Sequence, residues 1–282
     1  MSSVGPRAVL ALTGDRVGVI KGMRTSRISR WNSAAHPRSS VGCRPLADVL
    51  SGTMMYSELC AMAGTGVGLF CLWRVLSRVL KPPDGVNPQE LACRTCSALH
   101  AAPVGISAVL TVLGAVNPRV GPIAMSVSMG YFMHDAAAVL LMGTEKFAAP
   151  ILIHHGLCTA GMAAILTLSR HNIWYAALLQ WTECTIPIQF VCWLFEIYGG
   201  DEAWPRTYAA GRWLMAIAWV TMRLALMPVF FYTVFRNWST LDAIPKVSAL
   251  TVGPFLSAFN VGGLFKVILP GFPWWRRKGK QP

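Results

Sequence analysis

Polar side chains interrupt several long apolar stretches of this 282-residue sequence, and most are of types that transfer protons. An imidazole oriented by a carboxylate can take a proton from a hydroxyl or an amine, or carry a covalent acyl group. The candidate catalytic residues are His154, His155, His134, Asp135 and Glu183. The candidate substrate-binding residues are His100, Arg223 and Asn260.

The composition places these residues in a membrane. Apolar residues make up 54% of the chain and charged residues 13%, against about 45–50% and about 25% in soluble domains. This argues against a soluble enzyme and excludes a disordered chain. The net charge of +13 does not indicate a nucleic-acid binder, because outside the N-terminal tail Lys and Arg lie mostly in short gaps between apolar runs.

Seven apolar runs are each long enough to cross a hydrocarbon core of about 30 Å, which needs about 20 helical residues. We expect these runs at 54–73, 97–116, 122–142, 148–169, 172–194, 213–235 and 247–269. The sequence therefore predicts an all-α, multi-pass membrane protein with seven spans. Pro103, Pro187, Pro228 and Pro254 lie inside the runs and predict local kinks.

Counting residues from the turns predicts the depth of the polar groups. His134 lies about ten residues before the turn between the third and fourth runs, and His154 and His155 about ten after it. At 1.5 Å per residue, all three lie about 15 Å from that turn. The same count around the neighbouring turns places Glu183 and the helix of His100 at a similar depth. We therefore expect one polar layer near mid-membrane, with contributions from four helices.

Two further relations follow from helix geometry. Arg223 and Asn260 mirror each other around Leu241, about one turn away from the polar layer. Adjacent residues on a helix point about 100° apart, so the two adjacent polar pairs cannot all face one point. Some of these side chains must contact neighbouring helices instead.

Two alternatives to a catalytic layer remain. The polar groups could join helices by hydrogen bonds worth about 0.6 kcal/mol each, but so many buried ionisable groups favour a functional site. Imidazoles with carboxylates also suit Fe or Zn, although the sequence has no HxxxH or HxxHH box and the CxxC of Cys93 and Cys96 lacks a fourth ligand. We therefore expect neither a metal nor a cofactor. Gly64 and Gly68 form a GxxxG motif, which favours helix packing.

Loop charge predicts the orientation of the chain. Lys and Arg number eleven on one side of the membrane, with Arg212 counted as a loop residue, and four on the other. The C-terminus is therefore expected in the cytoplasm. Residues 1–48, with eight basic and two acidic groups, do not fit this orientation. We interpret them as a tail outside the fold. They are either a disordered or presequence-like segment, or an over-extension of a gene model whose protein should begin at Met54 or Met55.

The C-terminal residues Lys278 and Lys280 lie fifth and third from the end of the chain. This spacing is similar to the dilysine retrieval signal of endoplasmic-reticulum membrane proteins, which is bound by the retrieval coat on the cytosolic side. A basic stop at the membrane surface is the alternative.

Several segments in order along the chain resemble the TLC domain family. Its motifs are matched by Ser128-Met-Gly-Tyr-Phe-Met-His-Asp135, Leu152-Ile-His-His155, Glu183-Cys-Thr-Ile-Pro187, Ala258-Phe-Asn260 with Phe265-Lys266, and an opening with Arg94, Ser97 and His100. The family includes ceramide synthases, translocating-chain-associated membrane proteins, a ceroid-lipofuscinosis protein and the TLC domain-containing proteins. The resemblance covers about residues 90–275, after a first span and loop at 49–85 and before a basic cytoplasmic tail at 276–282.

The resemblance implies a membrane protein of the endoplasmic reticulum or a related compartment. Its last six spans would form a barrel around a lipid cavity lined by the histidines. His154 and His155 match the paired histidines with which ceramide synthases transfer an acyl group from acyl-CoA. Glu183 and Pro187 stand where ceramide synthases have HDxxD, so the chain looks like the TLC domain-containing branch, which is linked to membrane lipid composition.

These observations support two functional hypotheses. The first is a lipid-handling protein that binds membrane lipids and transfers an acyl group from acyl-CoA as a co-substrate. The second is a non-enzymatic regulator or cargo receptor of the secretory pathway that acts through its loops and C-terminal tail. Neither hypothesis involves nucleic acid.

Overall fold

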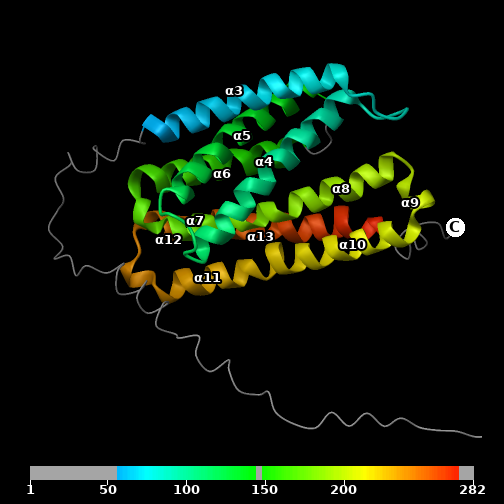
Figure 1. Cartoon of the computed structure of the whole chain (residues 1–282). Helices are drawn as coiled ribbons and strands as arrows, with labels where there is room; N and C mark the ends of the chain where they lie inside the picture. The colour runs from blue at the N-terminus through cyan, green and yellow to red at the C-terminus, as the bar shows by residue number, and fades with distance from the viewer. Residues whose placement is uncertain (1–55, 144–147, 273–282) are drawn as a thin grey trace, which may run out of the picture. The chain divides into compact units, whose positions relative to one another are not determined.

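A computed structural model describes residues 56–143 and 148–272, whose regular elements are all helical (Figure 1). The first half comprises α3 (Tyr56–Val79), α4 (Pro88–Val112), α5 (Val120–Met142) and α6 (Ala148–Leu168). The second half comprises η1 (Arg170–Asn172), α7 (Ile173–Gln180), η2 (Trp181–Cys184), α8 (Thr185–Ile197), α9 (Gly200–Ala203), α10 (Pro205–Trp219), η3 (Val220–Leu224), α11 (Leu226–Arg236), η4 (Trp238–Thr240), α12 (Ala243–Leu250), α13 (Val252–Gly263), η5 (Leu264–Ile268) and η6 (Leu269–Gly271). The predicted all-α class is confirmed for these residues. The predicted tail at 1–48 and the basic tail with Lys278 and Lys280 lie outside the described residues.

Six helical segments of the described chain are long and apolar enough to cross a membrane. They are Tyr56–Val79, Pro88–Val112, Val120–Met142, Ala149–Leu168, Pro205–Arg236 and Ala243–Gly271. The remaining predicted span, 172–194, corresponds to α7, η2 and α8, which follow one another directly. A 3-10 turn at η2 divides this segment into two short α-helices, so a seventh crossing stays a prediction.

The helix ends follow the local sequence. Asn87 caps α4, because its side chain accepts a hydrogen bond of 2.9 Å from the backbone N–H of Gln89, and Pro88 occupies the first turn. α5 stops at Gly143, whose φ of 63° lies in the left-handed region that favours glycine.

Three of the four prolines lie where a helix has just been interrupted. Pro187 follows the 3-10 turn η2, Pro228 follows the π-helical turn η3, and Pro254 follows the break at Thr251. Proline has no N–H for the carbonyl four residues earlier, so the preceding turn must adopt another hydrogen-bond pattern. In η3, for example, the N–H of Ala225 bonds the carbonyl of Val220, five residues back. The predicted irregularities are confirmed at these sites, whereas Pro103 lies inside an uninterrupted α4.

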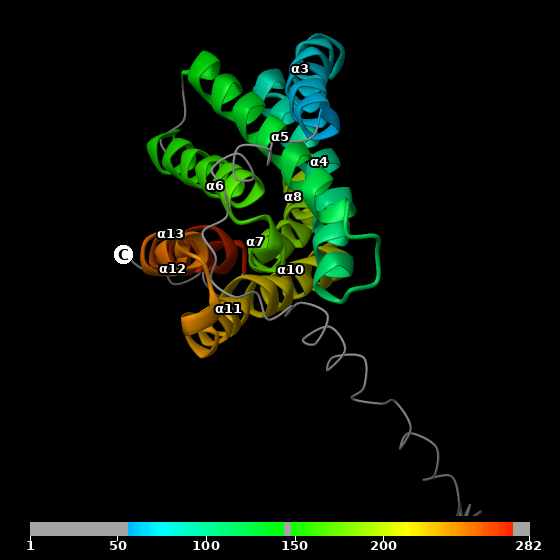
Figure 2. The same cartoon turned by 90° about the vertical axis from the view of Figure 1, so that its left-hand side faces the viewer.

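The helices pack in a recognisable order. α3 contacts α4 and α5, and α5 also contacts α6. The α7–η2–α8 segment contacts α4 on one side and α10 with α11 on the other, while α12 and α13 contact α6 and the α10–η3–α11 segment. An end-on view shows α7 and α8 near the centre of these helices, with α3 outermost beside α4 and α5 (Figure 2).

Glycines allow the closest approaches between helices. A Cβ on Gly130 of α5 would meet the carbonyl oxygen of Met62 and the amide of Gly66 on α3. By contrast, a Cβ on Gly64 or Gly68 would have no neighbour within 4 Å. The predicted role of the GxxxG motif in helix packing is therefore not fulfilled within the described chain, because the helix turns Gly66 rather than these two residues toward α5.

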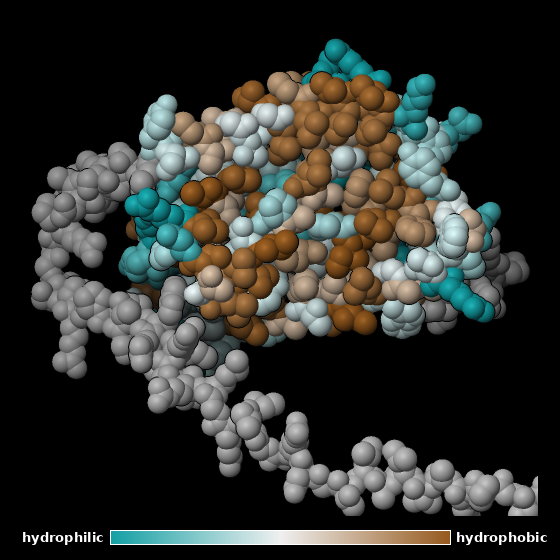
Figure 3. All heavy atoms as spheres, in the orientation of Figure 1, coloured by the Kyte–Doolittle hydropathy of each residue, from teal (hydrophilic) through white to brown (hydrophobic). Residues whose placement is uncertain are grey.

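The outer surface fits a membrane environment. Apolar side chains cover much of the middle of the face in Figure 3, and hydrophilic residues gather at its two ends. Leu99, Leu140 and Ile217 are among the large apolar residues that are more than half exposed. Helices that run between the two polar ends would present these side chains to lipid rather than to water.

Two arginines have partners that the sequence analysis did not assign. Arg212, counted there as a loop charge, is instead buried: its guanidinium lies 3.5 Å from Glu196 and donates to the carbonyls of Val267 and Ile268. Arg212 can be buried because the irregular backbone at η5 presents carbonyls that a long cationic side chain can reach. Arg170 pairs with buried Glu58 and so ties η1 to α3.

Candidate functional site

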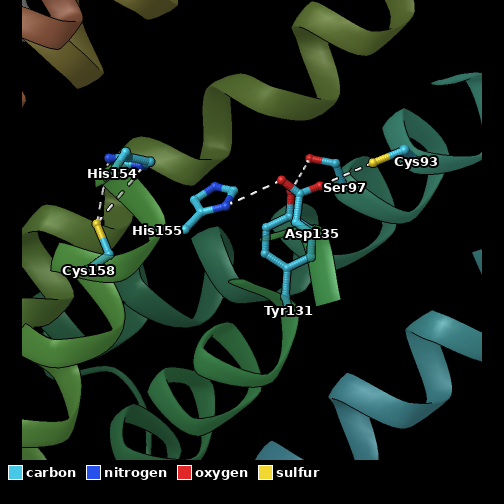
Figure 4. Close-up of polar contacts among 7 residues, drawn as sticks. All are labelled: Cys93, Ser97, Tyr131, Asp135, His154, His155 and Cys158. Atoms are coloured by element: carbon cyan, nitrogen blue, oxygen red, sulfur yellow. Dashed lines mark hydrogen bonds and ion pairs between the residues drawn. The ribbon is translucent and has the colours of Figure 1, made fainter. Parts of the chain in front are cut away.

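Asp135 and His155 form the first cluster, between α5 and α6. Nδ1 of His155 lies 3.3 Å from Oδ2 of Asp135, and the thiol of Cys93 on α4 donates to Oδ1 at 3.1 Å (Figure 4). The ring of His155 stacks on Phe132 with centroids 4.7 Å apart. Nδ1 of His155 thus lies at ion-pair distance from Asp135, although it makes no hydrogen bond within the described part of the chain.

His154 turns the other way. Figure 4 shows it beside Cys158 while His155 turns to Asp135, as expected from a rotation of about 100° between adjacent residues. Sγ of Cys158, one turn along α6, lies 3.7 Å from Nδ1 of His154. On its other side the imidazole stacks in parallel on Phe259 of α13, at 4.9 Å between centroids.

His100 belongs to a packed hydrogen-bond network. Its Nε2 lies 3.1 Å from the hydroxyl of Ser128, which also receives a hydrogen bond from the Gln180 amide. Its ring stacks on Tyr131 at 4.0 Å, and the Tyr131 hydroxyl donates to Ser97. These contacts join α4, α5 and α7, and they leave His100 96% buried.

His134 lies on the face of α5 toward α3. Its ring is 6.3 Å from Trp73 and 6.4 Å from Phe70, and the side chain is almost fully buried. Neither ring nitrogen has a hydrogen-bond partner within the described part of the chain.

Arg223 and Asn260, which the residue count placed at one depth, are in contact. Nη1 of Arg223 donates to Oδ1 of Asn260 at 3.3 Å, and the Asn260 amide donates back to the carbonyl of Arg223 at 3.2 Å. Nε of Arg223 donates to the hydroxyl of Thr185 at 2.7 Å, and its guanidinium lies 4.6 Å from the Trp219 ring. A buried cation requires such compensation, because it has lost its hydration.

Glu183 lies on the wall of the same cavity as Arg223. It belongs to η2 and is 91% buried. η2 precedes Pro187 and η3 precedes Pro228, so Glu183 and Arg223 lie on the irregular turns that the prolines impose. The prolines thus help to determine where these two side chains lie.

A cavity lies beside these groups, between α6, α7, α11, α12 and α13. Its volume is about 70 Å³, and its walls are mostly apolar. His154, Cys158, Glu183, Arg223 and Asn260 form its polar part. Apolar residues that line the rest include Leu157, Met162, Ile165, Leu179, Met227, Phe230 and Leu256. A mostly apolar pocket with a few convergent polar groups is the usual form of a ligand site.

The eight predicted site residues therefore divide into two sets. The cavity is lined by His154, Glu183, Arg223 and Asn260. The other four contact helix neighbours around it: His155 pairs with Asp135 behind His154, whereas His100 is held by Ser128 and His134 faces α3. At the cavity the structure brings together a base, a carboxylate and a cation, which suit proton transfer and stabilisation of a developing oxyanion.

Several polar residues of the site received no role in the sequence analysis. Thr185, Gln180 and Ser128 are neutral residues inside apolar runs, where they are common and carry little signal. Cys158 was not singled out from the sequence, although its position four residues after His154 places both on one helix face. Glu58 could have been found, because a carboxylate within a predicted span needs a partner.

No three His, Cys, Asp or Glu side chains of residues 56–143 and 148–272 converge in a way that could hold a metal ion.

Comparisons with known proteins give one match. A family model described as the TLC domain matches residues 94–275, which is more than half of the chain. No curated protein and no solved structure matches this chain. The matched region begins within α4, so it includes every residue that lines the cavity and leaves α3 outside.

Proposed function

This chain belongs to the TLC domain family, and on that premise we propose that it binds a lipid acyl chain in its cavity and transfers the acyl group. The observation that carries the proposal is the cavity itself, in which His154, Glu183 and Arg223 meet an otherwise apolar wall. Fatty chains require such a wall, because burying each CH₂ is worth about 0.8 kcal/mol.

We propose that α4–α5–α6, the α7–α8 segment, α10–α11 and α12–α13 act as the six spans of a barrel. The helices contact one another in sequence around a circuit, from α4 through α5, α6 and α12–α13 to α10–α11 and α7–α8, which returns to α4. This order supports the barrel and a crossing by α7–α8. α3 packs outside it as a seventh span.

The chemistry assigned to the cavity is acyl transfer from acyl-CoA to a hydroxyl or an amine of a lipid acceptor. His154 accepts the proton of the attacking group, and Arg223 stabilises the negative charge that develops on the carbonyl oxygen. Glu183 holds Arg223 in place and accepts a hydrogen bond from the acceptor. The pair of Asp135 and His155 supports His154 from behind and is a positioning element in this proposal.

We further propose that the protein resides in the endoplasmic reticulum, with its C-terminus in the cytoplasm. The excess of basic residues on the side of the α3–α4 turn supports this orientation even without Arg212, since Arg78, Lys81 and Arg206 remain there. The dilysine spacing of Lys278 and Lys280 supports the location and the retrieval coat as a partner.

An acyl-transfer assay tests the proposed function. The full chain, reconstituted in lipid nanodiscs, is incubated with hexadecanoyl-CoA and separate sphingoid, lysophospholipid and monoacylglycerol acceptors, and acylated products are measured by mass spectrometry. One acceptor is expected to be acylated. Replacing His154 with Ala should lower the rate by about 100-fold or more, the usual contribution of a general base.

His171 provides the matched control. It is an exposed histidine in η1 that lies 3.1 Å from Asp242, and it does not line the cavity. His171→Ala should retain the parent rate. If none of the acceptors is acylated, the enzymatic proposal fails, and the regulator or cargo-receptor hypothesis gains support.

A further inference from the structure

Cys158 is the cysteine of the described chain that lines the cavity. Its sulfur lies 3.7 Å from Nδ1 and 4.0 Å from Nε2 of His154, within reach of a weak thiol–imidazole hydrogen bond. It lines the cavity together with Glu183 and Arg223. A thiol beside an imidazole, next to a carboxylate and a cation, is an arrangement used for nucleophilic catalysis.

The wall beyond Cys158 continues along the same face of α6. Gly161, Met162 and Ile165 follow at intervals of three, four and seven residues and also line the cavity. A Cβ on Gly161 would meet nothing within 4 Å, so there is open space over this glycine. An acyl chain attached to the sulfur would therefore have an apolar path along α6.

Other candidate nucleophiles are directed elsewhere. His155 is paired with Asp135, and the thiol of Cys93 donates to the same carboxylate. Cys184 packs against the backbone of Gly105, where a Cβ would lie 2.6 Å from Sγ. These contacts leave Cys158 as the thiol that a lipid in the cavity can reach.

We infer that Cys158 is an S-acylation site at which the acyl group of acyl-CoA is held as a thioester before its transfer, an inference that rests on the function proposed above. The Cys158 sulfur attacks the carbonyl carbon of the acyl thioester while its proton passes to His154. The bond between that carbon and the CoA sulfur then breaks, and the CoA thiolate leaves with the electron pair and takes the proton from His154. The products are acylated Cys158 and free CoA, with no change in oxidation state.

The second half of the reaction regenerates the thiol. The hydroxyl or amine of the acceptor attacks the Cys158 thioester and gives its proton to His154. The departing sulfur takes this proton back, so one acyl group moves from CoA to the acceptor in each cycle. Because the enzyme-bound group is itself a thioester, it keeps the reactivity that acyl-CoA had.

Peptide mapping tests the inference. The full chain in nanodiscs is incubated with an alkyne-tagged hexadecanoyl-CoA without acceptor, and the adduct is located by tandem mass spectrometry. The tag is expected on Cys158, removable by neutral hydroxylamine as thioesters are. It should be lost in Cys158→Ala and retained in the matched Cys184→Ala. A tag on His154, a tag on another cysteine or no tag at all would overturn the inference.

A second variant examines the path along α6. Gly161→Phe should fill the open space and reduce labelling by the hexadecanoyl probe at least tenfold, while labelling of Cys158 by butanoyl-CoA persists. Equal loss of both probes, or of neither, would contradict attachment along this wall.

A photoreactive fatty acyl probe separates this inference from the proposed function. Cross-links to the cavity in the parent and in Cys158→Ala, without a hydroxylamine-sensitive adduct, would leave lipid binding standing and reject the thioester. Absence of cross-links in the cavity would reject the proposed function as well.

Discussion

At the scale of single residues, the burial of Arg223 and Glu183 beside one cavity is the most demanding feature of the site. Both side chains are more than nine-tenths buried, and they approach from η3 and η2, two turns that are far apart in the sequence. An isolated buried charge is strongly destabilising, so each residue depends on the other. Thr185 and Asn260 supply hydrogen bonds that an apolar site would lack.

Removing one partner of this pair should therefore destabilise the fold. Arg223→Met leaves Glu183 buried without its cation, and we expect a loss of about 3–5 kcal/mol in unfolding free energy. The double variant Arg223→Met with Glu183→Leu should recover much of this loss, because it buries no unpaired charge. Thermal unfolding in detergent measures the effect.

The exposed Arg236, which lies beside the Tyr232 hydroxyl, gives the matched control. Arg236→Met should unfold close to the parent midpoint. An equal midpoint for Arg223→Met would show that Arg223 and Glu183 do not stabilise each other, and the site geometry described above would then be wrong.

At the scale of elements, the helix that lies outside the matched family region is joined to the rest by close backbone contact. α3 packs on α5 where Gly66 faces Gly130, and the ion pair of Glu58 with Arg170 holds its N-terminal end. The Trp73 indole completes the contact through its hydrogen bond to the Gln89 carbonyl. This helix covers the side of α5 that carries His134.

A methyl group at Gly130 should disturb this contact. In Gly130→Ala the Cβ would meet the Met62 carbonyl oxygen, so we expect a loss of about 1–3 kcal/mol, as for other overpacked sites. Gly64→Ala, on a face of α3 with no neighbour within 4 Å, should be neutral or slightly stabilising. Equal unfolding midpoints for the two variants would contradict the described packing of α3 on α5.

At the scale of the whole molecule, the prediction that can be tested is the direction in which the chain crosses the membrane. Lys81 lies in the α3–α4 turn, and Arg119 lies at the opposite polar end, at the start of α5. Single cysteines at these positions, in a chain otherwise free of exposed thiols, report their side through a membrane-impermeant maleimide. Lys81→Cys should react from the cytosolic face, and Arg119→Cys only after permeabilisation. The reverse pattern would overturn the assigned orientation.

The sequence predicted the helical class, most of the spans and the equal depth of Arg223 and Asn260, because apolar run length and residue counting capture axial position. It could not predict the rotation of each helix. His134 and Asp135 are adjacent, yet one faces α3 and the other faces α6, and only packing decides which. Arg212 was misplaced because its partners are backbone carbonyls of an irregular turn, which the sequence does not reveal. The cavity depends on side chains from α5, α6, α7, α11, α12 and α13 and from the turns η2 and η3, which no local pattern reveals.

The most direct test of the account is to determine the structure of the full chain in nanodiscs after incubation with hexadecanoyl-CoA. We expect an elongated density between α6, α7, α11 and α13, with one end beside His154, Cys158 and Arg223 and its length along Met162 and Ile165. A cavity closed by side chains, or one that holds water but no lipid under saturating conditions, would contradict the central claim.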